Sequence, residues 1–286
     1  ANGRPKLSGI SLIKKIGKGG MGAVYYGVHP RLSNEVAIKV LPFHFAEKDP
    51  TMIKRFVGEA RIAAQVKSPH IVNVIDINEE ADIHFLVMEF VSGMSASDVM
   101  KKLAAGAMIP PIPAGSTAVP EWAALDIVIG ATEGLKAAHA YDIIHRDLKP
   151  DNILIPLVAG RSASSPLDFI RAKIADLGLA KTENSQTIGT VANASMGTPG
   201  YMPPEQVMDA KTASKASDIF AMGATLYALL RGSAPFAGAS VGQIMIETCS
   251  KPHPALSQFR PDVSAGTIKI IDYCLEKDPA NRYPNA

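Results

Sequence analysis

The pattern of apolar residues changes once along this chain, close to residue 90. Before that point, short runs of strand-forming residues alternate with turn-forming residues, at 10–16, 23–28, 35–41, 71–77 and 83–90. Short, closely spaced runs of this kind predict a mainly antiparallel sheet. The segment 52–66 interrupts them with apolar residues at helical spacing, which predicts one helix packed against the sheet.

After Gly93 the apolar spacing becomes helical. The clearest helix candidates are 97–105, 121–141, 215–231, 241–249 and 265–276. The sequence therefore predicts an α+β chain in which a small β-rich lobe, residues 1–90, precedes a larger and mainly helical lobe, residues 91–286. Two segments rich in Pro, Ser and Ala, 106–120 and 156–167, are predicted to be surface loops.

The charge balance argues against two classes of partner. Lys and Arg number 29 against 27 Asp and Glu, a formal net charge of +2, so we expect no general attraction to nucleic acid or to an anionic membrane. No apolar run approaches the ~20 residues that span a bilayer, so no membrane contact is expected in this segment, although an anchor outside it stays open.

Cys249 and Cys274 lie in apolar stretches and are predicted to be buried thiols, which suits a cytoplasmic location.

Three spaced glycines, Gly17, Gly19 and Gly22, lie between the first two predicted strands. Glycines at this spacing let a backbone pass close over phosphate groups and offer its N–H donors to them. A plain hairpin turn explains the same glycines about as well.

Lys39 lies inside an apolar strand, and Glu59 lies at the margin of the apolar stripe on the following helix. A strand lysine that points into solvent is the simpler interpretation. A buried charge requires a partner, however, and a Lys39–Glu59 pair would provide one and leave the ammonium group near phosphate oxygens.

Residues 145–152 read His-Arg-Asp-Leu-Lys-Pro-Asp-Asn and concentrate ionisable groups between two apolar elements, a density that packing does not explain. Asp176 follows a short predicted strand, 173–175, and is close to Gly178. Asn152 and Asp176 carry the oxygen atoms that Mg²⁺ prefers. Phosphoryl transfer needs a positioned nucleophile, cations against the phosphates and in-line geometry, and these residues supply such groups.

These motifs, together with Gly-Thr-Pro-Gly-Tyr-Met-Pro-Pro-Glu at 197–205, resemble the eukaryotic-like (Hanks-type) Ser/Thr protein kinase family, and bacterial members of it in particular. The motifs occur in the family's order, and the resemblance extends from about Ile10 to Arg282. It implies the two-lobed protein kinase fold, with residues 1–90 and 91–286 forming one kinase domain. Lys149 in Asp-Leu-Lys is the form that resembles Ser/Thr kinases.

The resemblance implies a role for each matching residue. Asp147 would accept the proton of the substrate hydroxyl and Lys149 would neutralise the moving phosphoryl group, while Lys39, fixed by Glu59, would hold the α- and β-phosphates of ATP. Asn152 and Asp176 would bind Mg²⁺, with Mn²⁺ as an alternative. The nucleotide-binding residues implied are Ile16, Gly17, Gly19, Gly22, Val24, Ala37, Lys39, Met88, Glu89, Val91 and Leu154.

The implied activity is transfer of the γ-phosphate of Mg-ATP to Ser or Thr hydroxyls of protein substrates, with a dimer for autophosphorylation in trans. The candidate acceptors are Ser185, Thr187, Thr190 and Ser195. Three further implied roles are structural: Thr198 contacts Asp147, Glu205 forms a buried ion pair with Arg282, and Asp218 braces the backbone of residues 145–152.

Three other functions stay open at this point. A pseudokinase scaffold predicts the loss of Lys39, Asp147, Asn152 or Asp176, all of which are present, although Leu177 replaces the usual phenylalanine. A small-molecule phosphotransferase would not need the long segment 182–205. A pure interaction module gives no reason for so many charged groups in one cleft.

Overall fold

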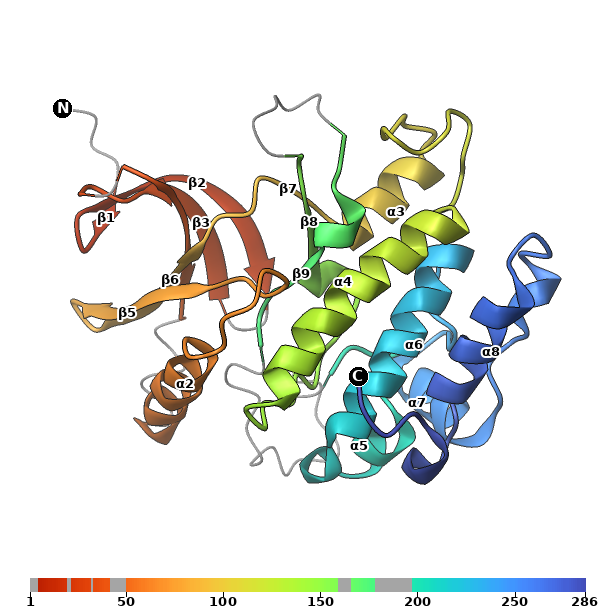
Figure 1. The fold of residues 1–286 in the computed structure, drawn as a ribbon. Coiled ribbons are helices and arrows are strands. Elements are labelled where there is room, and N and C mark those ends of the chain that lie inside the picture. Colours follow the sequence, from red (N-terminus) through yellow and green to blue (C-terminus); the bar gives the residue numbers. More distant parts are fainter. Residues whose placement is uncertain (1–4, 20–21, 32, 42–49, 159–165, 178–196) are drawn as a thin grey trace. The chain divides into compact units, whose positions relative to one another are not determined.

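The computed structural model describes residues 5–19, 22–31, 33–41, 50–158, 166–177 and 197–286 (Figure 1). The chain divides into two compact units. Of the described residues, the first unit contains those within 5–68 and 72–90, and the second contains those within 69–71, 91–177 and 197–286.

The first unit is built on a six-stranded sheet in which all neighbouring strands are antiparallel, as predicted. The strand order is β1-β2-β3-β4-β6-β5. The strands are β1 (Lys6–Leu7), β2 (Ile10–Gly19), β3 (Gly22–Val28), β4 (Glu35–Val40), β5 (Val74–Glu80) and β6 (Ile83–Glu89). β1 is two residues long and was not predicted from the sequence.

The two faces of this sheet differ because successive side chains of a strand point to opposite sides. One face carries an apolar cluster of Leu7, Ile10, Val36, Ile38, Phe85 and Val87. Ala37 and Lys39 alternate with Val36 and Ile38 along β4 and lie on the other face. The predicted helix is present as α2 (Pro50–Ala63), whose Ala60 and Ala63 are buried.

β5 begins at Val74, three residues later than the predicted start of that strand. Ile71 instead forms a parallel bridge with Ile174 and is 1% exposed. The apolar residue that suggested the strand is therefore buried in the second unit.

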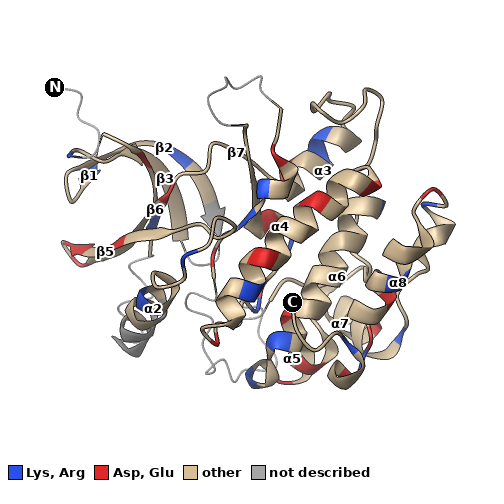
Figure 2. Cartoon of the chain, in the orientation of Figure 1, with Lys and Arg blue, Asp and Glu red and all other residues tan. Residues whose placement is uncertain are grey.

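The second unit is mainly helical, and the five helices predicted there are present with ends that differ by a few residues at most. The helices are α3 (Ala96–Ala104), α4 (Glu121–His139), α5 (Pro204–Met208), α6 (Lys215–Arg231), α7 (Val241–Ser250) and α8 (Ala265–Cys274). α4 and α6 lie side by side, and α8 packs on α6 (Figure 1). Acidic residues are spread along α4, and its one lysine, Lys136, lies in the last turn (Figure 2).

α6 has clear start and stop signals. Ser214 and Ser217 form a reciprocal capping box at its beginning, and Gly232, with φ of 90°, ends it in the left-handed conformation. Every residue from Ser217 to Leu230 is buried. The helix therefore forms the centre of the second unit.

A small antiparallel sheet completes the second unit, in the order β7-β8-β9. Its strands are β7 (Gly93–Ser95), β8 (Ile153–Pro156) and β9 (Lys173–Ile174). The prediction of a loop from residue 156 onward is wrong at its ends, because Pro156 belongs to β8 and Leu157 bridges to Leu167. Residues 106–120 contain no helix or strand, as predicted, and Ile109, Ile112 and Val119 within them are buried.

Both cysteines carry free thiols; Cys274 is buried, as predicted, whereas Cys249 is half-buried. Within the described ranges, no helix combines the length and apolar character needed to cross a bilayer.

Candidate active site

Residues 145–152 connect α4 to β8, and they end in a 3₁₀ turn at Pro150–Asn152. Leu148 and Ile153 are both 0% exposed and anchor the connection in the core of the second unit. Because these apolar side chains point inward, the polar residues between them are held at the surface of the core. We call residues 145–152 the catalytic loop.

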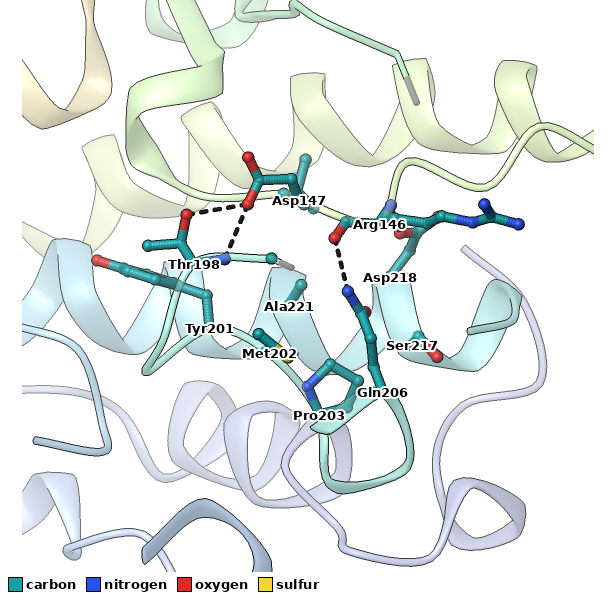
Figure 3. Close-up of a pocket in the computed structure, with 12 residues that line it drawn as sticks. Arg146, Asp147, Thr198, Tyr201, Met202, Pro203, Gln206, Ser217, Asp218 and Ala221 are labelled. Carbon is teal, nitrogen blue, oxygen red and sulfur yellow. Dashed lines mark hydrogen bonds between the residues drawn. The ribbon is translucent and has the colours of Figure 1, made fainter. Parts of the chain in front are cut away.

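The carboxylate of Asp147 has partners on both of its oxygen atoms. Thr198 donates to Oδ1 through its backbone N–H at 3.0 Å and its hydroxyl at 2.9 Å (Figure 3). Lys149 Nζ lies 3.2 Å from Oδ2 and donates to Thr198 Oγ1 at 2.5 Å. The structure thus brings Asp147, Lys149 and Thr198 together, as the sequence predicted for Thr198.

Asn152 directly precedes β8 and Asp176 lies two residues after β9, at the same end of this antiparallel strand pair. Asn152 Nδ2 donates to the backbone oxygen of Asp147 at 2.8 Å, and the backbone N–H of Ala175 donates to Asn152 O at 2.9 Å. Because Ala175 is hydrogen-bonded to Asn152, the next residue, Asp176, is held close to Asn152 along the chain.

These two residues have the chemistry that a divalent cation requires. The amide nitrogen of Asn152 is used toward Asp147, which leaves Oδ1 as the amide atom suited to a cation. Asp176 supplies a carboxylate, and Mg²⁺ takes oxygen ligands of both kinds.

Asp218, near the beginning of α6, holds the backbone of the catalytic loop through hydrogen bonds. Its Oδ2 accepts from the backbone N–H of His145 at 2.9 Å and lies 2.8 Å from His139 Nε2, and its Oδ1 accepts from the N–H of Arg146 at 2.9 Å. The residue is 0% exposed, and a buried carboxylate is stable only with such donors. The predicted bracing contact is present, and His139 adds a donor that sequence reasoning missed.

Two residues of this region have backbone conformations that are rare for residues with a Cβ atom. Arg146 has φ of 64° and Asp176 has φ of 61°, both in the left-handed region. Conformations of this kind persist only where the surroundings hold them, and they concentrate at functional sites.

Glu205 and Arg282 form the predicted ion pair in the second unit. Arg282 donates from its two terminal nitrogens to the two Glu205 oxygens, at 2.7 and 2.9 Å, and the Arg282 side chain is 0% exposed. Burial raises the pKa of Glu205, but the hydrogen bonds and charge of Arg282 outweigh it, so the pKa lies below its ordinary value. Glu205 is the second residue of α5, so the pair fixes this short helix.

A small cavity of about 10 Å³ lies beneath Asp147 (Figure 3). It is lined by the catalytic loop, by the segment 197–206 and by the start of α6. Tyr201 closes one side, and its burial, together with the charge of Asp151, raises the pKa of its hydroxyl to about 12. Tyr201 therefore stays a neutral hydroxyl near Asp147 throughout the physiological range.

In the first unit, the predicted nucleotide-binding residues occupy neighbouring positions of one sheet. Lys39 is 4% exposed and lies opposite Val24 on β3 and Leu86 on β6. Further pairs in register are Gly17 with Val24, Gly19 with Gly22, Ala37 with Met88 and Val36 with Glu89. Ile16 on β2 is 45% exposed.

The remaining predicted residues fall elsewhere. Val91 and Leu154 belong to the second unit, where Leu154 pairs with Ser95 and Lys173. Glu59 lies on α2, but its side chain is outside the described residues, so the pairing with Lys39 stays a prediction. The candidate acceptors Ser185, Thr187, Thr190 and Ser195 also lie outside the described residues, as does Gly178.

Two functional candidates were missed by sequence reasoning, His139 and Gln206. His139 is the last residue of α4 and was hidden in the apolar pattern of that helix. Gln206 donates from Nε2 to the backbone oxygen of Arg146 at 3.0 Å. No spacing rule marks either residue, and the position of Gln206 beside Glu205 was the one available signal.

The chain matches the family described as the protein kinase domain over residues 10–285. Among curated proteins, it is 34% identical over 279 residues to the serine/threonine-protein kinase Pkn1 of Myxococcus xanthus, covering 97% of this chain and 37% of that protein. It is 35% identical over 282 residues to the serine/threonine-protein kinase PrkC of Bacillus subtilis, covering 98% of this chain and 39% of that protein. The chain thus spans well under half the length of these relatives.

Among solved structures, the kinase domain of PknI from Mycobacterium tuberculosis is similar, with a TM-score of 0.68 and 25% sequence identity. The match covers 98% of this chain and 93% of that one. Together with the family match, this similarity confirms the predicted protein kinase fold.

Proposed function

The chain belongs to the protein kinase domain family, and from that premise we propose that it transfers the γ-phosphate of ATP to serine or threonine hydroxyl groups of proteins. The observation that carries the proposal is the arrangement of Asp147, Thr198 and Lys149. A carboxylate held by two donors from Thr198, with an ammonium 3.2 Å away, suits the positioning of an acceptor hydroxyl beside a phosphate group.

Asp147 and Lys149 divide the work at the reacting atoms in this proposal. The Asp147 carboxylate orients the acceptor hydroxyl and takes its proton as the oxygen attacks, acting from a fixed position. Lys149 offers positive charge where negative charge develops on the transferred group. Because Thr198 holds Oδ1 of Asp147, Oδ2 is the oxygen that faces Lys149.

Asn152 and Asp176 are the residues proposed to hold a divalent cation, with Mg²⁺ first and Mn²⁺ as the alternative. When bound, the ion supplies positive charge against the phosphates. In the first unit, we assign the same phosphate-facing role to Lys39, fixed by Glu59, and nucleotide contacts to the glycine-rich hairpin and to β4 and β6. Residues 1–90 and 91–286 would then act as the two lobes of one kinase domain.

The proposed partners are protein substrates, including a second copy of this chain that is phosphorylated within 185–195. A dimer that allows phosphorylation in trans belongs to this proposal. A cytoplasmic place of action also belongs to it, because the reaction consumes ATP and both cysteines carry free thiols.

The direct test incubates the protein with Mg²⁺ and labelled ATP, with and without a generic basic protein, and maps the phosphate by mass spectrometry. We expect phosphoserine and phosphothreonine and no phosphotyrosine. The matched control is Asp147→Asn, which keeps an oxygen for the Thr198 donors but cannot accept a proton. It should lower kcat by about 1,000-fold and leave ATP binding intact. Normal turnover of that variant would contradict the role of Asp147, and ATP binding without any transfer by the wild type would favour a pseudokinase.

A further inference from the structure

Gln206 reaches the catalytic loop from α5. The residue is 4% exposed, and its Nε2 donates to the backbone oxygen of Arg146 at 3.0 Å (Figure 3). That oxygen belongs to the peptide group that joins Arg146 to Asp147. The N–H of the same peptide, on Asp147, donates to His145 Nδ1 at 3.3 Å. Gln206 therefore contacts the oxygen, and His145 the N–H, of the peptide that precedes the Asp147 side chain.

The backbone that Gln206 contacts needs support. Arg146 has φ of 64°, a conformation that its Cβ atom disfavours. The N–H of Arg146 is bound by Asp218 Oδ1 at 2.9 Å, and its carbonyl oxygen is bound by Gln206. Side chains from two different helices, α6 and α5, thus hold the two backbone polar groups of this one residue.

The position of Gly197 indicates that the contact with Gln206 is built into the site. A Cβ atom at Gly197 would lie 3.0 Å from Gln206 Nε2 and 3.1 Å from Arg146 O. A larger residue would crowd both atoms of the hydrogen bond. Gly197 also directly precedes Thr198, which holds the Asp147 carboxylate. Thr198 therefore contacts the Asp147 side chain, and Gln206 contacts the carbonyl oxygen of the peptide that precedes Asp147.

We propose that Gln206 is a positioning residue for phosphoryl transfer: its amide fixes the peptide between Arg146 and Asp147 and so directs the Asp147 carboxylate toward the acceptor hydroxyl. This inference rests on the proposed kinase function. An apolar side chain of similar length would leave the Arg146 oxygen without this donor in a partly buried place, and the peptide would gain freedom to rotate.

The first experiment compares Gln206→Leu with the wild type in steady-state phosphorylation of a basic protein. We expect kcat to fall about tenfold, the order of one buried hydrogen bond, with KM for ATP within about twofold. Gln258→Leu, at an exposed position of the second unit, is the matched control and should behave as the wild type. Where Gln206→Leu does not fold, Gln206→Met takes its place.

An unchanged kcat in a folded Gln206 variant would overturn the inference while leaving the kinase activity of the wild type intact. A wild type without phosphotransfer would overturn both proposals. A parallel fall of kcat and of the folded fraction, with normal turnover per folded molecule, would reduce Gln206 to a structural residue and would also overturn the inference.

A second experiment tests whether Gln206 acts through the backbone of Arg146. Glycine adopts positive φ without the steric cost that alanine keeps, and both substitutions remove the arginine side chain. We therefore compare the fold-decrease of kcat that Gln206→Leu causes in two backgrounds. This fold-decrease should be at least about threefold smaller in the Arg146→Gly background than in the Arg146→Ala background. Equal losses in the two backgrounds would show that Gln206 does not act through this conformation.

Discussion

The catalytic loop and the glycine-rich hairpin of β2 and β3 are held in different ways. The loop is fixed by side chains from elsewhere in the second unit: Asp218 from α6, Gln206 from α5 and Thr198. The hairpin is held by its backbone ladder, which has register shifts between Leu12 and Lys14 and between Lys15 and Gly17. Its described side chains between residues 13 and 17 are exposed or half-buried.

This difference matches the two proposed tasks. A group that acts on a developing charge must be preorganised, because any rearrangement during the reaction adds to the barrier. A strand pair that covers a nucleotide has to admit and release it, and a ladder with few side-chain anchors can shift at lower cost. Substitutions in the two regions are therefore expected to differ in the size of their effects.

The largest effect is expected from Arg282→Leu, which removes the partner of Glu205 and so the anchor of α5. A partly buried carboxylate that keeps the Ser217 hydroxyl as a donor but has lost its cation should lower the free energy of unfolding by about 3–5 kcal/mol at neutral pH. In the wild type, the folded pKa of Glu205 is below the ordinary 4.5, so its stabilising contribution is present above that pH and is lost as the pH falls toward the folded value.

The variant should reverse this dependence. Without Arg282, burial is the largest remaining influence on the folded pKa of Glu205 and raises it against the smaller effects of the Ser217 and backbone hydrogen bonds, so stability is lost as the pH rises. Urea unfolding at pH 4 and pH 7 should therefore show a smaller difference between variant and wild type at pH 4. An equal difference at both pH values would contradict the assignment of the pKa shift to Arg282.

A slightly smaller effect is expected from Asp218→Asn. The amide group would place N–H donors against the N–H donors of His145 or Arg146, so the loop loses part of its brace. We expect kcat to fall about 100-fold and the free energy of unfolding to fall by about 2–3 kcal/mol. Kinetics and urea unfolding on the same preparation check both. A large loss of stability with normal kcat would show that the Asp218 hydrogen bonds are not needed to position Asp147.

A matched pair of glycine substitutions compares the two regions directly. Gly197→Ala places a Cβ atom 3.0 Å from Gln206 Nε2, whereas Gly17→Ala meets Val24 at ordinary contact distances of 3.6 and 3.7 Å. We expect Gly197→Ala to lower kcat about tenfold, through the displaced amide. Gly17→Ala should change the free energy of unfolding by about 0.5–1 kcal/mol at most. The alanine reduces the conformational freedom of the unfolded chain, and this offsets any small strain in the folded strand. An unchanged kcat in Gly197→Ala, or a larger loss of stability in Gly17→Ala, would contradict the comparison.

The elements that the sequence predicted well are those with long periodic signals. α6 begins at Lys215 and ends at Arg231, as predicted, because Ser214 and Gly232 mark its ends. In the small sheet, β9 was predicted as the strand 173–175, whereas β7 was missed because its three residues are too few to show alternation. β5 was misplaced because Ile71 is apolar for a reason outside the strand, its contact with Ile174.

The residues of the candidate site were likewise predicted only in part. Asp147, Lys149 and Asn152 are close in sequence, so a local motif could indicate them. Gln206 lies 60 residues from its partner Arg146 and His139 lies 79 residues from Asp218, so only the folded chain brings these pairs together. The conformation of Arg146 also had no signal, because arginine does not mark positive φ as glycine does.

The complete burial of α6 between Ser217 and Leu230 has a consequence for how this protein opens. Amide hydrogens in such a helix can exchange with deuterium only when the whole second unit unfolds. Asp218 belongs to the same stretch, so solvent should reach the aspartate that braces the catalytic loop only in molecules that have lost their tertiary structure altogether.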